Sequence, residues 1–412
     1  MHSEPDYEDM DGEKKSEIGR ESLALHAAHS GKLEIRSKVP LASRDDLSRA
    51  YTPGVAEVCR KIADDPETVW KYTLKSNTIA IISDGTAVLG LGNIGPLAGI
   101  PVMEGKAILF KEFAGVDAFP ICLDAKSEDL VRIIRSLAPV FGGINLEDIA
   151  APACFEIEEE LQDLGIPVMH DDQHGAAVAV LAAIINACRV TGKCFENLKV
   201  VVCGAGAAGY AICRLLKCIG YDTQSCTPVK ELIACDTSGI IYRGRPGLYE
   251  NKYKFILGDE TNSIHRTGTL ADAMRSADVF VGVSVANLVT QEMIRSMGSD
   301  PIVLSLANPV PEIMPDKAKA AGAAIIGTGR SDYPNQVNNV LAFPGIFRGA
   351  LDASATRITD EMKIAAAHAI AECVCDPTPE RILPDPLDRG VVPAVAQAVK
   401  KAAVACGVVR NT

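Results

Sequence analysis

The sequence predicts an α/β protein in which helices cover both faces of a parallel, doubly wound sheet. Between about residues 170 and 330, short apolar stretches alternate with helical stretches, a pattern typical of repeated strand–helix–strand units. One of these strands runs directly into a glycine-rich turn that opens a helix. A smaller α/β segment precedes this region and an alanine-rich helical segment follows it. We therefore expect two α/β domains and a C-terminal helical segment.

The elements of the first half follow from residue type and spacing. Residues 78–83 are β-branched and apolar, which predicts a buried strand, whereas 127–141 places Leu130, Ile134 and Leu137 on one helical face. In chain order we expect a loose acidic lead-in at 1–20, a helix at 22–30, a loop and a helix within 44–64, a strand at 78–83, a glycine-rich loop at 90–95, a strand at 118–123, a helix at 127–141, a loop at 144–152, a helix at 154–164 and a strand at 168–169.

The second half begins with a long alanine-rich helix and continues as alternating strands and helices. We expect a helix at 176–190, a strand at 199–203, a helix at 210–219, a strand at 231–235, a helix at 270–276, a strand at 279–282, a helix at 291–297, a strand at 301–306, a helix at 315–321 and a strand at 324–327. The last stretch, 349–407, is helical and contains a proline-rich loop at 376–388.

Composition and charge exclude several classes of protein. The 412 residues are 48% apolar and 23% charged, as in soluble globular proteins, and the formal net charge is −12. An acidic chain without a basic stripe is a poor partner for nucleic acid. A small anionic substrate remains compatible with this charge, because a local cluster or a metal ion can reverse the field inside a cleft.

The cysteines and the N-terminus indicate a cytoplasmic protein. The 13 cysteines form no CxxC pair, so we expect buried, unpaired thiols in a reducing compartment rather than disulfides. The N-terminus is acidic and resembles neither a signal nor a transit peptide. The charge-free stretch 85–103 contains five glycines and two prolines, and the apolar run 176–188 is too short to span a bilayer. We therefore expect no membrane segment.

The glycine-rich turn has the context of a dinucleotide-binding site. The segment Gly204-Ala-Gly206-Ala207-Ala208-Gly209 follows an apolar strand and opens a helix. In such turns the first glycine allows the tight bend, the second lets the backbone approach a pyrophosphate, and the third lets the helix pack against the strand. The alternative is a tight turn that binds no ligand.

The form of the nucleotide is left open by the sequence. Asp236 ends the second strand of this region, where an acid can bind the ribose 2′-hydroxyl of NAD. The alternative role for Asp236 is that of a turn residue. Arg243 and Arg245 follow shortly after and could reach the 2′-phosphate of NADP. We therefore expect either NAD or NADP.

Seven short motifs stand in one order along the chain: YTPGVA at 51–56, EGKA at 104–107, NLEDI at 145–149, HDDQHG at 170–175, GAGAAG at 204–209, LANP at 306–309 and QVNNV at 336–340. In this order the chain resembles malic enzymes of the short bacterial and archaeal type, from about residue 31 onward. The resemblance implies an enzyme that oxidises (S)-malate at C2 with NAD(P)⁺ and decarboxylates the product to pyruvate and CO₂.

The resemblance also implies a metal site formed by Glu147, Asp148 and Asp172. A divalent cation that chelates the C1 carboxylate and the C2 oxygen stabilises the enolate formed on decarboxylation, and Mg²⁺ and Mn²⁺ prefer oxygen ligands. The alternatives are solvated loop acids, or a zinc pair formed by His170 and His174, which stand four residues apart.

The catalytic residues implied by the resemblance are Lys106, Asp171 and Tyr51. Lys106 would take the proton of the C2 hydroxyl, Asp171 would pair with it, and Tyr51 would protonate C3. A lysine acts as a base near neutral pH only when its pKa is lowered, and we expect burial and the cation to outweigh the opposing effect of Asp171. Lys111 is the nearby alternative base, and a structural hydroxyl contact is the alternative role for Tyr51.

Two asparagines match substrate-binding positions of the family. Asn308 ends a strand at the carboxyl edge of the sheet, where ligands bind in such folds, so it is expected to contact cofactor as well as substrate. Asn338 is the second position, with the adjacent Asn339 as the alternative. Amide groups suit the recognition of carboxylates and hydroxyls.

One feature of the larger eukaryotic members is missing. Those enzymes carry an arginine before the first glycine-rich segment, where it binds substrate carboxylate, and residues 83–90 contain none. The candidates to replace it are Ser83, Thr86 and the backbone amides of 90–95.

These inferences predict the division of the chain. Residues 1–173 would form the N-terminal metal and catalytic domain, 174–345 the NAD(P)-binding Rossmann domain, and 346–412 a C-terminal helical segment that packs back on the first domain. The resemblance implies a homodimer or a higher homo-oligomer, with malate and pyruvate as small-molecule partners.

Two other functions fit the same plan. One is a different NAD(P)-dependent 2-hydroxyacid or amino-acid dehydrogenase, which would not need the three acids as a metal cluster. The other is a non-catalytic nicotinamide-nucleotide sensor, which would bind nucleotide without turnover. The presence of Tyr51, Lys106 and the acids disfavours the sensor.

Overall fold

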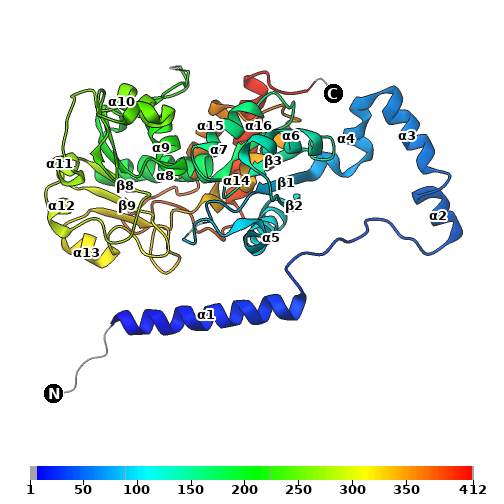
Figure 1. Cartoon of the computed structure of the whole chain (residues 1–412), viewed down its shortest axis with the longest axis horizontal. Coiled ribbons are helices and arrows are strands. Elements are labelled where there is room, and N and C mark those ends of the chain that lie inside the picture. Colours follow the sequence, from blue (N-terminus) through cyan, green and yellow to red (C-terminus); the bar gives the residue numbers. More distant parts are fainter. Residues whose placement is uncertain (1–6, 89, 223, 411–412) are drawn as a thin grey trace.

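The computed structural model describes the backbone of residues 7–88, 90–222 and 224–410, and the side chains from residue 17 onward within these ranges. Two α/β units lie side by side, and helices of the C-terminal segment lie beside the N-terminal unit (Figure 1). An N-terminal arm extends away from both units (Figure 1). The α/β class expected from the sequence is confirmed.

The N-terminal unit is built on a four-stranded parallel sheet in the order β2-β1-β3-β4. The strands are β1 Thr78–Ser83, β2 Asp117–Cys122, β3 Gly143–Leu146 and β4 Val168–His170. Long helices connect them: α5 Gly95–Ala114, α6 Ser127–Leu137 and α7 Ala153–Glu160. The loop expected from residue 144 is wrong in its first part, because β3 is a central strand. Two glycines and the polar Asn145 hide this short strand in the sequence.

The second unit has a six-stranded sheet in the order β10-β9-β8-β5-β6-β7, parallel except for β7. The strands are β5 Lys199–Cys203, β6 Glu231–Asp236, β7 Gly239–Ile240, β8 Val279–Gly282, β9 Ile302–Ser305 and β10 Ile325–Thr328. From β5 the chain passes to β6 on one side and then to β8 on the other, so the strand order reverses beside β5. This reversal creates the crevice in which doubly wound sheets bind nucleotides. The two-residue strand β7 was not expected from the sequence.

The remaining helices surround this sheet and link it to the first unit. In the second unit they are α8 Asp171–Thr191, α9 Ala207–Lys217, α10 Lys252–Glu260, α11 Leu270–Met274, α12 Gln291–Arg295 and α13 Pro315–Ala320. The C-terminal segment adds α14 Phe343–Asp352, α15 Asp360–Glu372 and α16 Val391–Ala405. Short 3₁₀ turns include η5 at Asn339–Leu341. Helix α10 is absent from the sequence-based expectation, because its apolar residues show little helical periodicity.

Helix α8 is the central helix of the protein. It packs against α9 and α15, and by length and composition it could cross a membrane. Its most apolar window is 72% buried inside the protein, so its apolar character is explained by packing on every side. It begins five residues earlier than expected, because Asp171 and Asp172 form its first turn, where acidic side chains favour a helix.

The C-terminal helices complete the core of the N-terminal unit. Helix α14 packs against α5, and α16 packs against both α14 and α5. Phe110 of α5 lies edge-on to Phe343 and Phe347 of α14, with ring centroids 4.8 and 5.5 Å apart. This aromatic cluster joins segments more than two hundred residues apart, so the N-terminal sheet depends on the C-terminal end of the chain for its packing.

The N-terminal arm leaves apolar side chains in solvent. It consists of α1 Tyr7–His29, an extended segment, α2 Arg44–Ala50, α3 Val55–Asp64 and α4 Val69–Tyr72. Lys32 ties its middle to α5 through the carbonyl oxygen of Pro101, at 2.6 Å. The expected loose segment at 1–20 is wrong from residue 7 onward, where the backbone is helical, and residues 1–6 lie outside the described part. The exposed apolar residues of the arm include Leu23, Leu33, Ile35, Val39, Leu41, Leu47 and Tyr51.

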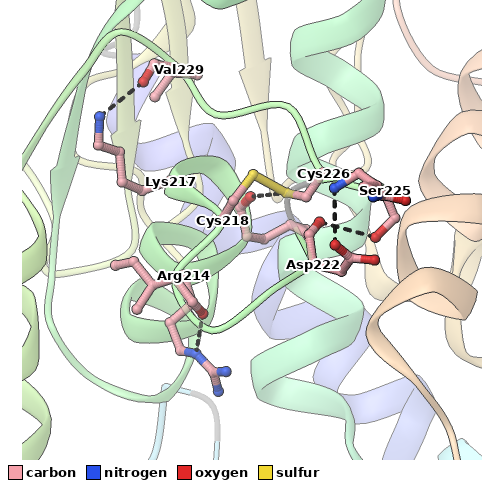
Figure 2. The surroundings of a disulfide bond; sticks show 10 residues. Arg214, Lys217, Cys218, Asp222, Ser225, Cys226 and Val229 are labelled. Atoms are coloured by element: carbon pink, nitrogen blue, oxygen red, sulfur yellow. Dashed lines mark hydrogen bonds between the residues drawn. A yellow bond between two sulfur atoms is a disulfide. The ribbon is translucent and has the colours of Figure 1, made fainter.

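A disulfide bond closes the loop after α9. Cys218 at the end of the helix bonds Cys226, eight residues on (Figure 2). The expectation that all cysteines are unpaired is therefore wrong for these two, which the spacing in the sequence did not mark. The thiols of Cys154, Cys203 and Cys213 are free and buried, as expected.

Removal of this disulfide is expected to lower the stability of the second unit. The closed loop is short, so the cross-link should contribute about 2–3 kcal/mol to the free energy of unfolding. Urea unfolding of the oxidised protein and of Cys226→Ser measures this difference, with both proteins repeated in a thiol reductant as the control. Equal stability of the two proteins under oxidising conditions would contradict the prediction.

Candidate active site

The acidic motifs meet at the carboxyl edge of the N-terminal sheet. Strand β3 ends at Leu146 and is followed by Glu147 and Asp148, and β4 ends at His170 and is followed by Asp171 and Asp172. Leu146 and His170 are paired in the register of these parallel neighbours. The two acid pairs therefore lie side by side, although more than twenty residues separate them in the sequence.

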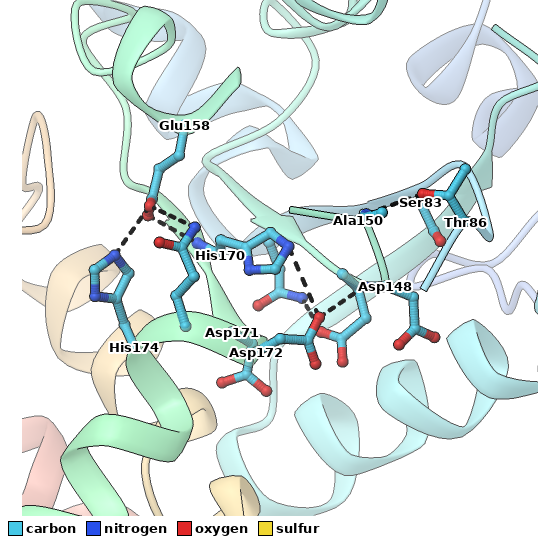
Figure 3. Close-up of polar contacts among 12 residues, drawn as sticks. Ser83, Thr86, Asp148, Ala150, Glu158, His170, Asp171, Asp172 and His174 are labelled. Carbon is cyan, nitrogen blue, oxygen red and sulfur yellow. Dashed lines mark hydrogen bonds and ion pairs between the residues drawn. The ribbon is translucent and has the colours of Figure 1, made fainter. Parts of the chain in front are cut away.

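Three of these acids form a cluster with the geometry of a cation site. Glu147, Asp148 and Asp172 each place a carboxylate oxygen within 4.8 Å of those of the other two. The backbone N–H of Asp148 donates to Asp172 Oδ2 at 2.8 Å (Figure 3). Asn145 donates to Glu147 Oε2, also at 2.8 Å. These contacts hold the oxygens in place for a ligand common to all three.

The electrostatics of the cluster favour the binding of a cation. Burial and the nearby Asp172 raise the pKa of Glu147 to about 7, although Lys106 opposes this. Burial also raises the pKa of Asp172 to about 6. Carboxylates crowded in this way are stabilised by a divalent cation, and an all-oxygen set suits Mg²⁺ or Mn²⁺. The residues therefore fit the expected metal.

Lys106 lies beside this cluster, buried in α5. Its Nζ is 2.6 Å from Asp171 Oδ2 and 2.8 Å from Glu147 Oε1, and it lies 4.1 Å from the centre of the Phe343 ring. Burial alone lowers the pKa of Lys106, but the carboxylates of Asp171, Glu147 and Asp172 outweigh it and raise the pKa above its ordinary value. The expected lowering of this pKa included the effect of the cation and stays a prediction, because the protein groups alone shift the pKa in the opposite direction.

Asp171 accepts hydrogen bonds from two distant parts of the chain. Its Oδ2 accepts from Lys106 and from Asn339 Nδ2, the latter at 2.6 Å. A Cβ atom at Gly175, one helical turn later, would collide with Asp171 Oδ1. The glycine of the HDDQHG motif therefore provides the space for this carboxylate. Burial raises the pKa of Asp171 to about 7 against the opposing effect of Lys106.

The two adjacent asparagines have different contacts. Asn338 caps η5, its Oδ1 accepting from the N–H of Val340 at 3.0 Å. Asn339, the alternative in the sequence, is the one that contacts Asp171. Asn308 follows β9 and lies beside the glycine-rich loop. A Cβ atom at Gly90 would lie 3.6 Å from the carbonyl oxygen of Asn308. The second unit thus meets the first through Asn308, beside Gly90, and through Asn339 of η5, beside Asp171.

The alternative residues considered for the chemistry lie beside different partners. Lys111 is exposed and pairs with Asp117 at 2.6 Å. His174 Nε2 pairs with Glu158 at 2.9 Å, whereas His170 Nε2 lies 3.7 Å from Asp172 (Figure 3). The two histidine rings therefore point to different carboxylates and do not form a zinc pair.

Tyr51 stands apart from the other site residues. It follows α2 in the N-terminal arm and its side chain is 67% exposed. The part of the arm that carries α2 lies away from α5, the helix that contains Lys106 (Figure 1). Within a single chain, the structure therefore does not bring Tyr51 to Lys106.

The candidates for the missing arginine lie in the loop after β1. Ser83 Oγ accepts from the N–H of Gly85 at 3.0 Å, and Thr86 Oγ1 accepts from the N–H of Ala150 at 2.9 Å (Figure 3). The amides of Ile94 and Gly95 donate to the carbonyl oxygen of Gly85. Ser83, Thr86 and these two amides thus stabilise the loop, so their part in carboxylate binding stays a prediction.

The glycine turn has the shape that a dinucleotide requires. Gly204 has a φ of +114° and a Cβ there would meet the carbonyl oxygen of Val283, and a Cβ at Gly209 would collide with the carbonyl oxygen of Gly204. In contrast, a Cβ at Gly206 would enter open space. Ala207 and Ala208 begin α9, whose amides can receive a pyrophosphate.

At the end of β6, Asp236 is fully engaged by protein groups. Its two oxygens accept from Arg245 at 2.9 and 2.7 Å, from the N–H of Ser238 at 2.9 Å and from Lys254 at 2.8 Å. Burial opposes ionisation, but these donors lower the pKa to about 2. Arg243 instead pairs with Asp259. Asp236, Arg245 and Lys254 line a cavity of about 660 Å³.

Sequence reasoning missed Lys254, Glu158 and the contact of Asn339. Lys254 lies in the unexpected helix α10, and Glu158 is one of several acids in α7. No local pattern distinguishes them, since their partners come from other elements.

Comparison with known proteins gives one answer. Residues 173–404 match the family described as "Malic enzyme, NAD binding domain", and residues 30–131 match "Malic enzyme, N-terminal domain". The chain is 54% identical over 399 residues to the bifunctional malic/malolactic enzyme of Bacillus subtilis, covering 96% of this chain and 95% of that protein. It is 51% identical to the NAD-dependent malic enzyme of Geobacillus stearothermophilus, covering 97% of this chain and 82% of that one.

A solved structure agrees with both relatives. The crystal structure of the NAD-dependent malic enzyme of Thermotoga maritima superposes with a TM-score of 0.87 at 49% identity, covering 92% of this chain and 98% of that chain. Together with the carboxylate cluster, the buried lysine and the nucleotide turn, these matches disfavour the other dehydrogenases and the sensor. The chain belongs to the malic enzyme family and is a metal-dependent enzyme that converts (S)-malate to pyruvate and CO₂ while reducing NAD(P)⁺.

Proposed function

We propose that the residues gathered at the carboxyl ends of β3 and β4 carry out this reaction. The observation that carries the proposal is the contact of Lys106 with Asp171 and Glu147, beside a cluster of three carboxylate ligands. When bound by Glu147, Asp148 and Asp172, a divalent cation supplies Lewis-acid polarisation of the substrate's C2 oxygen. The protein groups supply the proton transfers and the orientation of the substrate.

Lys106 is the proposed base for the C2 hydroxyl. Its ammonium donates to Asp171 Oδ2 at 2.6 Å, so this carboxylate is the group to which Lys106 can pass a proton. The carboxylates alone favour the ammonium form of Lys106, and a bound divalent cation would favour the amine. Once this proton has moved to Asp171, the Lys106 amine can take the proton of the hydroxyl. Phe343 covers the amine and excludes water from it.

The asparagines are proposed to bind the substrate and the cofactor. Asn308 at the end of β9 and Asn338 before η5 both lie on the second unit and are half-buried, so their amides can reach a ligand held between the units. Asn339 orients Asp171. We also propose that the chain divides at 1–173, 174–345 and 346–412. The proposed metal ligands fall within the first range, and the nucleotide turn and the two substrate-binding asparagines fall within the second.

Replacement of Lys106 by alanine is expected to lower kcat/KM for malate by at least about a hundredfold, the contribution typical of a positioned general base. Steady-state assays with malate and Mn²⁺ measure the effect. Lys111→Ala is the matched control, because Lys111 lies in the same helix but is exposed. Retained nucleotide binding by the variant would show that the second unit is intact, and near-normal turnover would refute the role of Lys106.

We also propose that the enzyme is a homodimer in which Tyr51 acts in the site of a second copy. The arm that carries Tyr51 leaves Leu47 and other apolar side chains in solvent, and contiguous exposed apolar residues mark an interaction surface. In a symmetric dimer, each arm can then bring its tyrosine to the Lys106 of the other subunit, where it would protonate C3. The proposed location of this dimer is the cytoplasm.

Co-expression of Tyr51→Phe and Lys106→Ala subunits tests this arrangement. Each variant alone is expected to be inactive, but a random mixture should recover about a quarter of wild-type activity, because each heterodimer has one complete site. Analytical ultracentrifugation of the wild-type protein gives the oligomeric state. A mixture that stays inactive, from subunits shown to form heterodimers, would place Tyr51 in its own chain's site or outside catalysis.

The pocket at Asp236 supports NADP⁺ as the preferred cofactor. Four donors occupy the Asp236 carboxylate, so it has no lone pair left for a ribose hydroxyl. Lys254 uses one of its three donors on Asp236 and is partly exposed to the cavity. Lys254 and Arg245 carry two positive charges beside the one negative charge of Asp236. The remaining positive charge suits a 2′-phosphate.

Lys254→Ala is therefore expected to lower the ratio of kcat/KM for NADP⁺ to that for NAD⁺ by about tenfold, equivalent to one charge-assisted hydrogen bond of about 1.4 kcal/mol. The assay contains malate and Mn²⁺ with each nucleotide in turn, and it also tests the overall reaction. Arg243→Ala is the control, since Arg243 pairs outside the pocket. A ratio that Lys254→Ala leaves unchanged would contradict the preference.

A further inference from the structure

We propose that Glu158 is a positioning residue for the metal site, acting through the first turn of α8. This inference rests on the proposed assignment of Asp171 and Asp172. Glu158 belongs to α7 and lies behind His170, on the far side from Asp148 (Figure 3). It therefore does not touch the carboxylate cluster and cannot serve as a ligand of the same cation.

Three donors around the acidic pair converge on this one carboxylate. Glu158 Oε1 accepts from the backbone N–H of His170 at 2.9 Å. Its Oε2 accepts from Gln173 Nε2 at 3.1 Å and pairs with His174 Nε2 at 2.9 Å (Figure 3). The donors stand immediately before and after Asp171 and Asp172, so Glu158 holds both ends of the segment that carries them.

Because Glu158 is buried, its carboxylate depends on these three hydrogen bonds. The residue is 9% exposed, and a buried carboxylate is stable only when its oxygens are hydrogen-bonded. The buried Lys363 of α15 adds a positive charge nearby. The β4 end and the α8 start therefore lose their common anchor if the carboxylate changes, whereas the sheet register remains.

The backbone linkage gives the route from Glu158 to the cation. The N–H of Asp148 donates to Asp172 Oδ2, so a shift of the α8 start moves Asp172 relative to Asp148 and Glu147. Groups that orient metal ligands from behind typically change metal affinity 10–100-fold when they are replaced. Replacement of Glu158 should therefore weaken metal binding directly, and any change in hydride transfer should follow from that loss.

Glu158→Gln tests the proposal with little change in volume. A neutral amide has one acceptor oxygen for three donors, and its NH₂ group faces at least one of them. The measurement is Mn²⁺ binding without substrate, followed by the electron paramagnetic resonance signal of free Mn²⁺. We expect an increase in Kd of at least about tenfold, with nucleotide binding by the second unit unchanged.

Glu159→Gln is the matched control. Glu159 is the next residue on α7, but it is exposed and pairs with Lys252 at 3.3 Å, so its replacement should leave the Mn²⁺ affinity at the wild-type value. Glu158→Asp, which keeps the charge and both oxygens, should bind Mn²⁺ more tightly than Glu158→Gln. A purely structural role would lower thermal stability in both Glu158 variants without this order of affinities.

The outcomes separate this inference from the proposed function. A wild-type protein that does not bind Mn²⁺ would refute the metal site itself. A wild-type protein that binds Mn²⁺, with Glu158→Gln binding equally well, would overturn only the role of Glu158. If Glu158→Gln does not fold, Gln173→Leu removes one of the three donors, and an unchanged Mn²⁺ affinity in that variant would overturn the role just as well.

Discussion

The burial of several carboxylates around one ammonium is the constraint on which the rest of the structure depends. Glu147 and Asp171 are buried and Asp172 is half-buried, and burial raises the pKa of each. Lys106 contacts two of them but cannot neutralise all three. Such a group is stable only when fixed donors and a cation hold it together, so the surrounding elements are arranged to supply these contacts.

The scaffold meets this constraint with elements from distant parts of the chain. The register of β3 and β4 brings the two acid pairs together, and Gly175 leaves the space that the Asp171 carboxylate fills. Asn339 comes from the second unit, and Phe343 comes from the C-terminal helix that covers Lys106. The active site is therefore assembled only when all three segments have packed, which links the formation of the site to the formation of the common core.

The parts of this arrangement that sequence could predict are those carried by local patterns. The strands at 78–83, 199–203 and 279–282 are found where β-branched apolar runs place them, and the three acids proposed as metal ligands follow strands that share one sheet edge. Contacts between distant elements could not be predicted in this way. For example, Asn339 rather than Asn338 contacts Asp171. No local sequence pattern indicates the partners of Glu158 or the pairing of Cys218 with Cys226.

The geometry of the site explains how a chain with a net charge of −12 can bind an anionic substrate. Four carboxyl groups lie beside one ammonium, and even with the raised pKa values of Glu147, Asp171 and Asp172 this group has an excess of negative charge that repels a dicarboxylate. A divalent cation bound by Glu147, Asp148 and Asp172 would offset this excess. Charges elsewhere on the surface are screened over about 8 Å in physiological salt. The groups at the site, rather than the net charge of the chain, therefore decide whether a dicarboxylate can bind, and an acidic protein can bind an acidic substrate once a cation is in place.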